Sequence, residues 1–262
     1  MEFFAISNGI PIHILDTKKG DTAILLLHGY LETLYIFNEF IEVLQKKYRV
    51  IAIDLPGHGL SGSDKDINTM DFCAHVAADV LAKCGVEKAV VAGHSMGGYV
   101  AQSCIKLYPE LFSSLILLNS TPFADSAEKK EDRKREMDLI LSAKLGHLAT
   151  LSIPKMYSPA NLRRLDEKIE ETVEITETHD PNGIVACIKG MMEREDNTAL
   201  LAKQEKAMFV FGTDDKFITE QTREKLIADF PNVKSVTIPQ TGHNSFIEEP
   251  LAVFEAINGF IG

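Results

Sequence analysis

The sequence predicts an α/β fold, a mostly parallel twisted sheet with helices on both faces and a helical cap insertion. Three observations lead to this prediction. Short apolar runs typical of buried strands alternate with amphipathic stretches along most of the chain. Polar residues directly follow several of these runs. Strand signals disappear between about 121 and 201. We therefore expect an α/β core made of residues 1–120 and 202–262, and a helical cap, or lid, at 121–201.

The N-terminal part of the chain begins with two predicted strands, at 3–6 and 10–15. Asn8-Gly9 between them favours a tight hairpin turn. The continuous apolar run at 23–27 is typical of a strand covered on both faces. Thr33 can cap a helix with an apolar face. The other elements predicted before the insertion are a strand at 48–53, a helix at 70–84 that Gly85 ends, a strand at 88–92, a helix at 99–107 and a strand at 114–118.

The predicted insertion contains a highly charged helix at 127–141. Its charges are mixed in sign, which favours a solvated face over a binding patch. Shorter amphipathic segments follow, interrupted at Pro154, Pro159 and Pro181. Strand signals then return, and the last predicted elements are a strand at 207–211, a helix at 219–229, a strand at 233–238 and a helix at 251–261.

Composition narrows the class of protein. A chain of 262 residues with 45% hydrophobic content can bury one large core. The net charge of -11 argues against nucleic acid and anionic membranes as partners. No apolar run is long enough to span a bilayer, and residues 1–9 lack a signal-peptide pattern, so we expect a cytoplasmic protein. The scattered cysteines predict buried free thiols and not a disulfide framework: Cys73, Cys84, Cys104 and Cys187.

The stretch Gly93-His94-Ser95-Met96-Gly97 matches the pattern G-x-S-x-G and lies between a predicted strand and a predicted helix. A serine on such a tight turn has strained backbone geometry and needs small neighbours two residues away. The turn would present the Ser95 hydroxyl to a pocket and place the Met96 amide at a helix N-terminus, which favours an oxyanion. The alternative is a glycine-rich turn with an incidental serine.

A serine hydroxyl at neutral pH needs a base, and the base needs an orienting carboxylate. Asp214 and Asp215 follow the strand predicted at 207–211, and His243 follows the strand predicted at 233–238. Because the carboxyl ends of parallel strands meet at one edge of a sheet, these side chains are expected near Ser95. On spacing alone, either aspartate could reach the histidine. Other polar residues expected at this edge are His28, Asp54 and Asn119.

The chain carries five motifs in one order: His28-Gly29, Asp54-x-Pro56-Gly57-x-Gly59-x-Ser61, Gly93-His94-Ser95-Met96-Gly97-Gly98, Gly212-x-x-Asp215 and Gly242-His243. In these motifs it resembles the α/β-hydrolase fold proteins over nearly its whole length. The resemblance implies Ser95 as nucleophile, His243 as base and Asp215 as acid. It also implies an oxyanion hole made by the backbone amides of Tyr30 and Met96. Residues 183–201 are similar to the cap end of the 3-oxoadipate enol-lactonase and small-esterase branch.

The expected function is therefore a serine hydrolase of small carboxylic esters or lactones that needs no cofactor and no metal, since no His/Cys/Asp cluster has ligand spacing. Thioester or carbon–carbon bond hydrolysis would use the same groups. A non-catalytic small-molecule receptor on the same scaffold is the alternative from another class. The oligomeric state is left open. The candidate substrate-binding residues in the insertion are Met156, Met191, Met192, His147 and His179. We expect structural roles for His28, His58 and His94.

Overall fold

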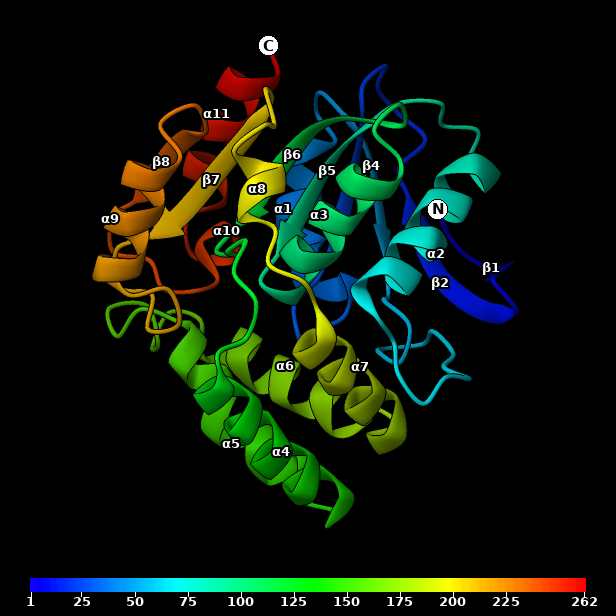
Figure 1. The fold of residues 1–262 in the computed structure, drawn as a ribbon, viewed down its shortest axis with the longest axis vertical. Coiled ribbons are helices and arrows are strands. Elements are labelled where there is room, and N and C mark those ends of the chain that lie inside the picture. Colours follow the sequence, from blue (N-terminus) through cyan, green and yellow to red (C-terminus); the bar gives the residue numbers. More distant parts are fainter.

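The computed structural model describes residues 1–262 and contains one eight-stranded sheet with the strand order β1-β2-β4-β3-β5-β6-β7-β8 (Figure 1). The first two strands, β1 and β2, pair antiparallel, and β2 pairs antiparallel with β4, whereas all other neighbours are parallel. The predicted α/β class and mostly parallel sheet are therefore confirmed. The strands are β1 (Glu2–Ser7), β2 (Ile10–Asp16), β3 (Ala23–Leu27), β4 (Arg49–Ile53), β5 (Ala89–His94), β6 (Phe112–Leu118), β7 (Ala207–Gly212) and β8 (Lys234–Ile238).

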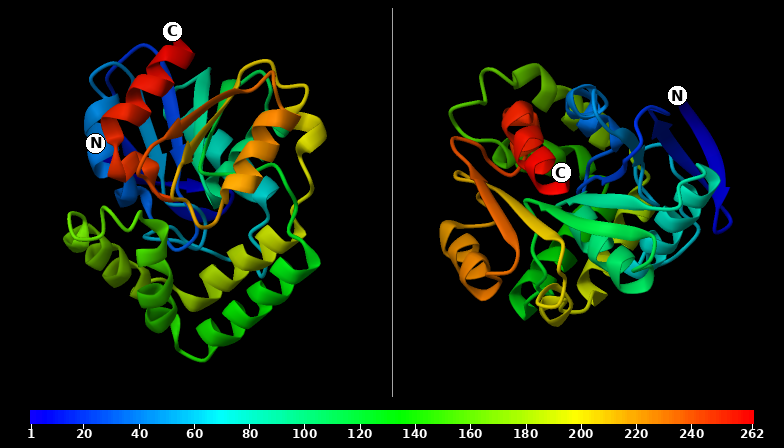
Figure 2. Two further views of the ribbon diagram at one scale, coloured as in Figure 1. Left: turned by 90° about the vertical axis from the view of Figure 1, so that its left-hand side faces the viewer. Right: turned by 90° about the horizontal axis from the view of Figure 1, so that it is seen from above.

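Helices cover both faces of this sheet, so its central strands are buried. The helices α2 (Met70–Lys83) and α3 (Met96–Leu107) pack together on one face, and α1 (Asn38–Leu44) and α11 (Pro250–Ile261) pack together on the other (Figure 2). All residues of β3, β5 and β7 are buried. Continuous apolar strands are the expected consequence of a sheet covered on both sides. Two further helices follow β7 and β8, namely α9 (Glu220–Asp229) and α10 (Ser245–Glu248).

The predicted hairpin is confirmed, while several predicted boundaries move. Asn8 and Gly9 both have positive φ, 50° and 89°, as a tight hairpin turn requires. Strand β5 continues to His94 because Gly93 and His94 remain paired with β6, a tertiary contact that outweighs the local glycine signal. Strand β6 begins at Phe112 and not at 114. The helix expected after Thr33 begins with a 3₁₀ turn, η1 (Leu34–Phe37), before α1.

Between β6 and β7 the chain forms helices only, in agreement with the loss of strand signals. In Figure 1 the helices between residues 127 and 193 lie together below the sheet, at the carboxyl ends of its parallel strands, whereas the short helix at 198–201 lies higher, beside the sheet. Helix α7 (Pro181–Glu193) contacts the core directly, because Asn68 N donates to Ala186 O at 3.0 Å and the Cys187 thiol donates to Pro56 O at 3.0 Å. The elements are α4 (Ala127–Leu141), α5 (Leu145–Ser152), η2 (Ile153–Met156), α6 (Asp166–Glu177), α7 (Pro181–Glu193) and α8 (Thr198–Leu201).

The four cysteines have the free, buried state that the sequence predicts. None of the helices combines the length and the apolar character that crossing a bilayer requires.

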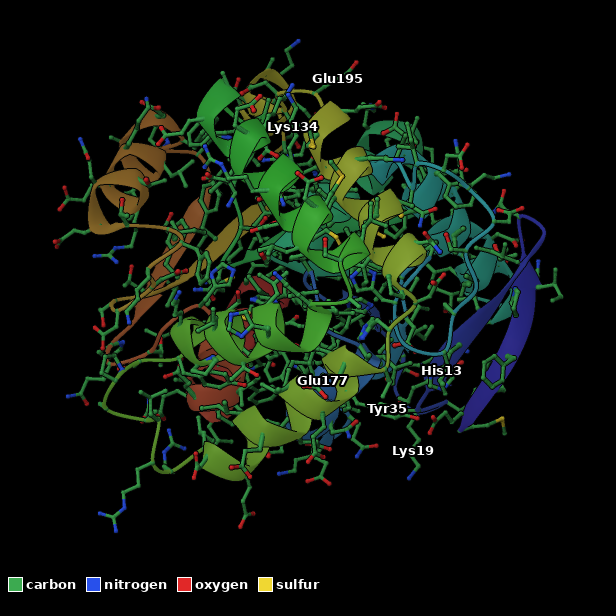
Figure 3. The ribbon with its side chains drawn as sticks, turned by 90° about the horizontal axis from the view of Figure 1, so that it is seen from below. His13, Lys19, Tyr35, Lys134, Glu177 and Glu195 are labelled. Atoms are coloured by element: carbon green, nitrogen blue, oxygen red, sulfur yellow. The ribbon has the colours of Figure 1, made fainter.

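A buried histidine joins the antiparallel edge of the sheet to the loop after β4. His13 is 1% exposed, with its Nδ1 2.8 Å from Asp54 Oδ2 and its Nε2 2.7 Å from Glu2 Oε1 (Figure 3). Since both partners are carboxylate acceptors, both ring nitrogens donate, which requires the imidazolium form. Burial lowers the pKa of His13, but the hydrogen bonds and charges of Asp54 and Glu2 outweigh it, so that the pKa is raised. Tyr35 donates to the same Glu2 carboxylate.

We predict that His13 makes the free energy of unfolding depend on pH. A raised folded-state pKa contributes stability that is fully present below the unfolded-state value of about 6.5 and is lost as pH rises through the folded-state pKa. Urea unfolding from mildly acidic to mildly alkaline pH should therefore show a loss of stability in wild type that is smaller in His13→Gln. His75→Gln, at an exposed histidine, is the control and should follow wild type. Equal losses in His13→Gln and wild type would contradict the prediction.

Candidate active site

Ser95 lies on a sharp turn between β5 and α3, with φ 48° and ψ -114°. This conformation is strained for a residue other than glycine and is typical of a nucleophile presented by a strand–turn–helix unit. The turn needs small neighbours. A Cβ added to Gly97 would lie 2.1 Å from Leu27 O, and one added to Gly93 would lie 2.2 Å from Gly97 O. The local geometry thus explains why glycine occupies both positions of the G-x-S-x-G pattern.

The structure places Asp215 directly beside His243. His243 Nδ1 lies 2.8 Å from Asp215 Oδ2, and both side chains are buried. The other carboxylate oxygen, Oδ1, accepts from the amides of Phe217 at 2.8 Å and Ile218 at 3.0 Å. Burial raises the pKa of Asp215, but the charge and hydrogen bond of His243 and the bond from Asn119 outweigh it, so that the pKa is lowered. The buried carboxylate therefore stays ionised and can hold the imidazole ring with Nδ1 protonated.

Asp214 has different partners, although it is adjacent in the sequence. Its Oδ2 accepts from Ser158 Oγ at 2.6 Å, and its Oδ1 accepts from Thr213 Oγ1 at 2.9 Å. Asp214 therefore joins the end of β7 to the helical segment and does not contact His243. The geometry separates the two aspartates that spacing alone left equivalent.

Asn119 holds the Asp215 carboxylate in place, a role that the sequence analysis did not assign to it. It has a positive φ of 46° directly after β6, a conformation that asparagine tolerates better than most residues. Its Nδ2 donates to Asp215 Oδ2 at 3.0 Å and to Gly242 O at 3.2 Å, and its Oδ1 accepts from Ser245 Oγ at 2.6 Å. The one sequence signal that could have indicated this role is the position of Asn119 directly after a parallel strand.

A buried hydrogen-bonded pair, Glu32 and His94, connects the loop after β3 to the loop that carries His243. Glu32 Oε2 accepts from Gly29 N at 2.7 Å and lies 2.8 Å from His94 Nδ1. His94 Nε2 lies 3.0 Å from His243 O. Burial raises the pKa of Glu32, but His94 and the Gly29 amide lower it by more than burial raises it. The net pKa is therefore lowered, and Glu32 stays ionised. His94 is therefore a packed, hydrogen-bonded neighbour of the serine turn, as expected.

His28 and His58 also have the structural roles expected of them. His28 Nδ1 donates to Gly29 O at 2.8 Å, and its Nε2 accepts from Leu55 N at 2.9 Å. Burial lowers the pKa of His28 and that of His58, so both rings are neutral. His58 packs against His28, with 5.1 Å between the ring centroids. The two rings together join the loop after β3 to the loop after β4.

Two backbone amides near Ser95 are available as hydrogen-bond donors. Tyr30 N–H makes no hydrogen bond within the protein. Met96 is the first residue of α3, where an N–H has no partner within the helix. These are the two amides that the resemblance implies for an oxyanion hole. Met96 adds the favourable dipole of a helix N-terminus.

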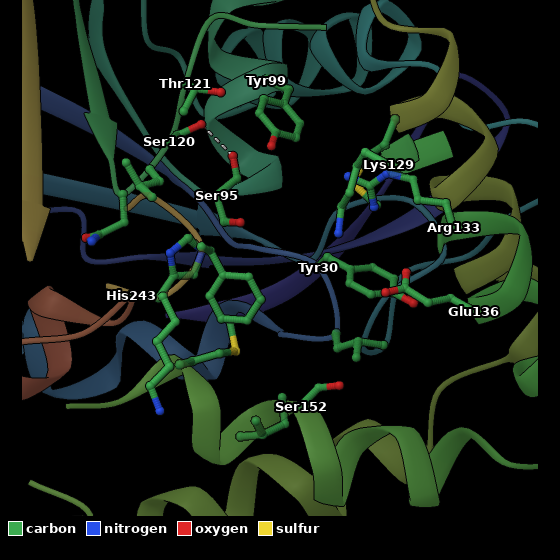
Figure 4. A pocket seen from close by; sticks show the side chains of 18 of the residues that line it. Tyr30, Ser95, Tyr99, Ser120, Thr121, Lys129, Arg133, Glu136, Ser152 and His243 are labelled. Atoms are coloured by element: carbon green, nitrogen blue, oxygen red, sulfur yellow. Dashed lines mark hydrogen bonds between the residues drawn. The ribbon is translucent and has the colours of Figure 1, made fainter. Parts of the chain in front are cut away.

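Ser95 and His243 line one cavity of about 380 Å³ between the sheet edge and the helical segment (Figure 4). No hydrogen bond joins the two side chains; in catalytic sites such bonds often tighten only when substrate is present. Part of the wall is apolar, as expected of a site for a small organic molecule. The apolar and aromatic lining residues are Tyr30, Leu31, Tyr99, Leu148, Ile153, Met156, Met191, Phe217 and Ile218.

Of the five predicted substrate-binding residues, only Met156 and Met191 line this cavity. Met192 follows Met191 on α7, so its side chain points elsewhere on the helix and packs on the hydrophobic core. His147 is exposed on α5. His179 is buried outside the cavity lining, with its Nδ1 3.0 Å from Ile175 O. Tertiary packing therefore removes these three from the cavity wall.

The charged helix α4 differs from expectation, because one side of it faces the cavity. Lys129, Arg133 and Glu136 line the cavity, and they have the i, i+4, i+7 spacing of one helix face. Arg133 is only 6% exposed and forms an ion pair with Asp125. The mixed charges of this run favoured a solvated face over a binding patch, because they conceal this spacing in the sequence.

Comparisons with known proteins agree with this architecture. Residues 22–250 match the family described as alpha/beta hydrolase fold. The chain is 28% identical to the uncharacterized hydrolase YugF of Bacillus subtilis, covering 93% of this chain and 91% of that protein. It is 26% identical to the pimeloyl-[acyl-carrier protein] methyl ester esterase of Xanthomonas campestris pv. campestris, and the match covers 94% of this chain and 98% of that protein. It superposes on the structure of a thermophilic esterase from Thermogutta terrifontis with malate bound, with a TM-score of 0.92 and 29% identity. The superposition covers 100% of this chain and 98% of the esterase. With its strand order, its serine turn and this match over most of its length, the chain belongs to the α/β-hydrolase fold family.

Proposed function

We propose that the protein is a serine hydrolase that cleaves a small carboxylic ester or lactone through an acyl-enzyme intermediate. The observation that carries the proposal is the convergence of three side chains at one sheet edge. Ser95 on its strained turn and His243 share a cavity, and Asp215 holds His243 Nδ1. The names of two relatives, a methyl ester esterase and a thermophilic esterase, support ester hydrolysis.

In the proposed mechanism, Ser95 Oγ attacks the carbonyl carbon while His243 Nε2 accepts the hydroxyl proton. The amides of Tyr30 and Met96 donate to the oxyanion that forms, and Asp215 stabilises the imidazolium. When the tetrahedral intermediate collapses, the ester C–O bond breaks and His243 returns the proton to the leaving alcohol. A water molecule, deprotonated by His243, then attacks the acyl-enzyme and releases the acid and free Ser95.

We predict that Ser95→Ala abolishes ester hydrolysis while the protein remains folded, because loss of a triad nucleophile lowers kcat by about 10⁶. Hydrolysis of p-nitrophenyl acetate measures the effect. Labelling by a fluorophosphonate probe, expected in wild type and absent in Ser95→Ala, provides the second measurement. Retention of more than a few per cent of wild-type activity would show that Ser95 is not the nucleophile. Absence of both turnover and labelling in wild type would favour the receptor alternative.

A second prediction compares the two aspartates. Asp215→Asn keeps the shape of the side chain but can hold His243 in the wrong tautomer, so kcat should fall by about 10⁴. Asp214→Asn is the matched control, and it should lose less than about tenfold because Asp214 bonds to Ser158 and not to His243. Steady-state kinetics of both variants on one ester near neutral pH provide the measurement. The reverse ranking would assign the acid role to Asp214.

A third prediction concerns the acyl side of the cavity. Met191→Ala enlarges the cavity and should shift the preference of kcat/KM toward longer or bulkier acyl chains, because Met191 lines the wall. Met192→Ala, one residue away and outside the cavity, should keep the wild-type preference. A series of p-nitrophenyl esters from acetate to octanoate measures both profiles. Identical profiles for Met191→Ala and wild type would exclude Met191 from the acyl pocket.

A further inference from the structure

The cavity has two chemically different sides. Ser95 and His243 lie on one side, whereas Lys129, Arg133 and Glu136 extend from α4 on the opposite side, close to the Tyr30 ring (Figure 4). The triad chemistry proposed above uses none of these three charged side chains. A group of charges placed across the cavity from the nucleophile can instead bind a part of the substrate that does not react.

The charges around this end of the cavity are predominantly positive. Arg133 and Arg194 form ion pairs with the same carboxylate, that of Asp125, which leaves one positive charge uncompensated. Lys129 lines this end and forms no ion pair, whereas Lys216 adds a positive charge on the side of the cavity that carries His243. Glu136 is the one acidic side chain in the cavity lining. Since the whole chain carries a net charge of -11, a positive cavity is a local exception that would attract an anion.

Several polar atoms at this end have no partner in the protein. Tyr30 Oη and Glu136 Oε2 are both buried without a hydrogen bond. Arg133 donates to Asp125 through Nε, and its two terminal nitrogens make no hydrogen bond within the protein. Burial raises the pKa of Tyr30 well above its usual value, with a further rise from the charge of Glu136, so the hydroxyl keeps its proton and can donate. Unpartnered buried donors facing a cavity are costly unless a ligand binds them.

We infer that Arg133, Lys129 and the Tyr30 hydroxyl form a subsite for a carboxylate, so that the substrate is an ester or lactone with a free carboxylate remote from the scissile bond. This inference rests on the proposed hydrolase function and specifies its substrate class. The paired terminal nitrogens of a guanidinium match the two oxygens of a carboxylate. Glu136 limits the net positive charge of the subsite, which favours a singly charged carboxylate over a dianionic phosphate.

The test compares pairs of esters that differ only in this charge. On the acyl side, monomethyl glutarate is compared with the methyl ester in which an isopropyl group replaces its carboxylate. On the alcohol side, the acetate ester of γ-hydroxybutyrate is compared with its isopropyl counterpart. In at least one pair, wild-type kcat/KM should be about tenfold to a hundredfold higher for the anionic ester, the range expected for charge-assisted hydrogen bonds. Added salt should reduce this ratio.

Three variants assign the preference to α4. Lys129→Gln and Arg133→Gln should each lower the anionic-to-neutral ratio by about tenfold, mainly through KM. Removal of Arg133 leaves Asp125 paired with Arg194 at 2.7 Å, which limits damage to the fold, and Lys129 has no ion pair to lose. Glu136→Gln should raise the ratio. Lys134→Gln is the matched control, because Lys134 is exposed on the same helix and lies outside the cavity, and it should keep the wild-type ratio (Figure 3).

The outcomes separate this inference from the proposed function. Hydrolysis of the neutral esters with ratios near one in both pairs would overturn the carboxylate subsite and leave the hydrolase intact. A high ratio that persists in both Lys129→Gln and Arg133→Gln would also overturn the assignment to α4. Absence of hydrolysis of every ester, together with absence of fluorophosphonate labelling, would refute the proposed function itself.

Discussion

The candidate site depends on one backbone constraint, the positive φ of Ser95 between a buried strand and a buried helix. A strained conformation persists only when its surroundings determine it completely. Here β5 is paired on both sides, with β3 and β6, and α3 lies so close to β3 that only glycine fits at position 97. The sheet and helix therefore hold the serine in place before any substrate binds, and the rest of the site is arranged around that fixed point.

Besides the Asp215 contact to the ring, three contacts hold the backbone around His243, the proposed base, and one of them comes from the helical segment between β6 and β7. Met156 O accepts from the amides of His243 at 2.7 Å and Asn244 at 3.1 Å. Glu248 accepts from Gly242 N at 2.6 Å and from Ser158 N at 2.9 Å, so it joins both segments. The buried pair of His94 and Glu32 adds the third support. The helical segment is thus part of the framework that orients His243, in addition to forming a wall of the cavity.

The same segment gives the cavity its polarity. Helix α4 turns one face of a highly charged sequence inward, and the pairing of Asp125 with both Arg133 and Arg194 makes burial of the two arginines tolerable. Arg194 also lies over the Tyr99 ring, 3.8 Å from its centroid, and thereby supports the cavity wall from behind. A hydrophobic cavity would select substrates by shape and length, whereas this one also presents charge at a defined side.

The sequence by itself determined the fold class, the strands and core helices, and the placement of Ser95, His243 and the two aspartates 214 and 215 directly after strands, because apolar periodicity, breakers and the serine turn are local signals. Parallel strands then place whatever follows them at one edge. Only the tertiary structure decided which polar groups meet there. Asn119 on Asp215, the inward face of α4 and the loss of His147, His179 and Met192 from the cavity all depend on how distant segments pack. Such contacts are absent from local sequence, since the direction of a side chain on a mixed-charge helix is set by its neighbours in space and not by its neighbours in the chain.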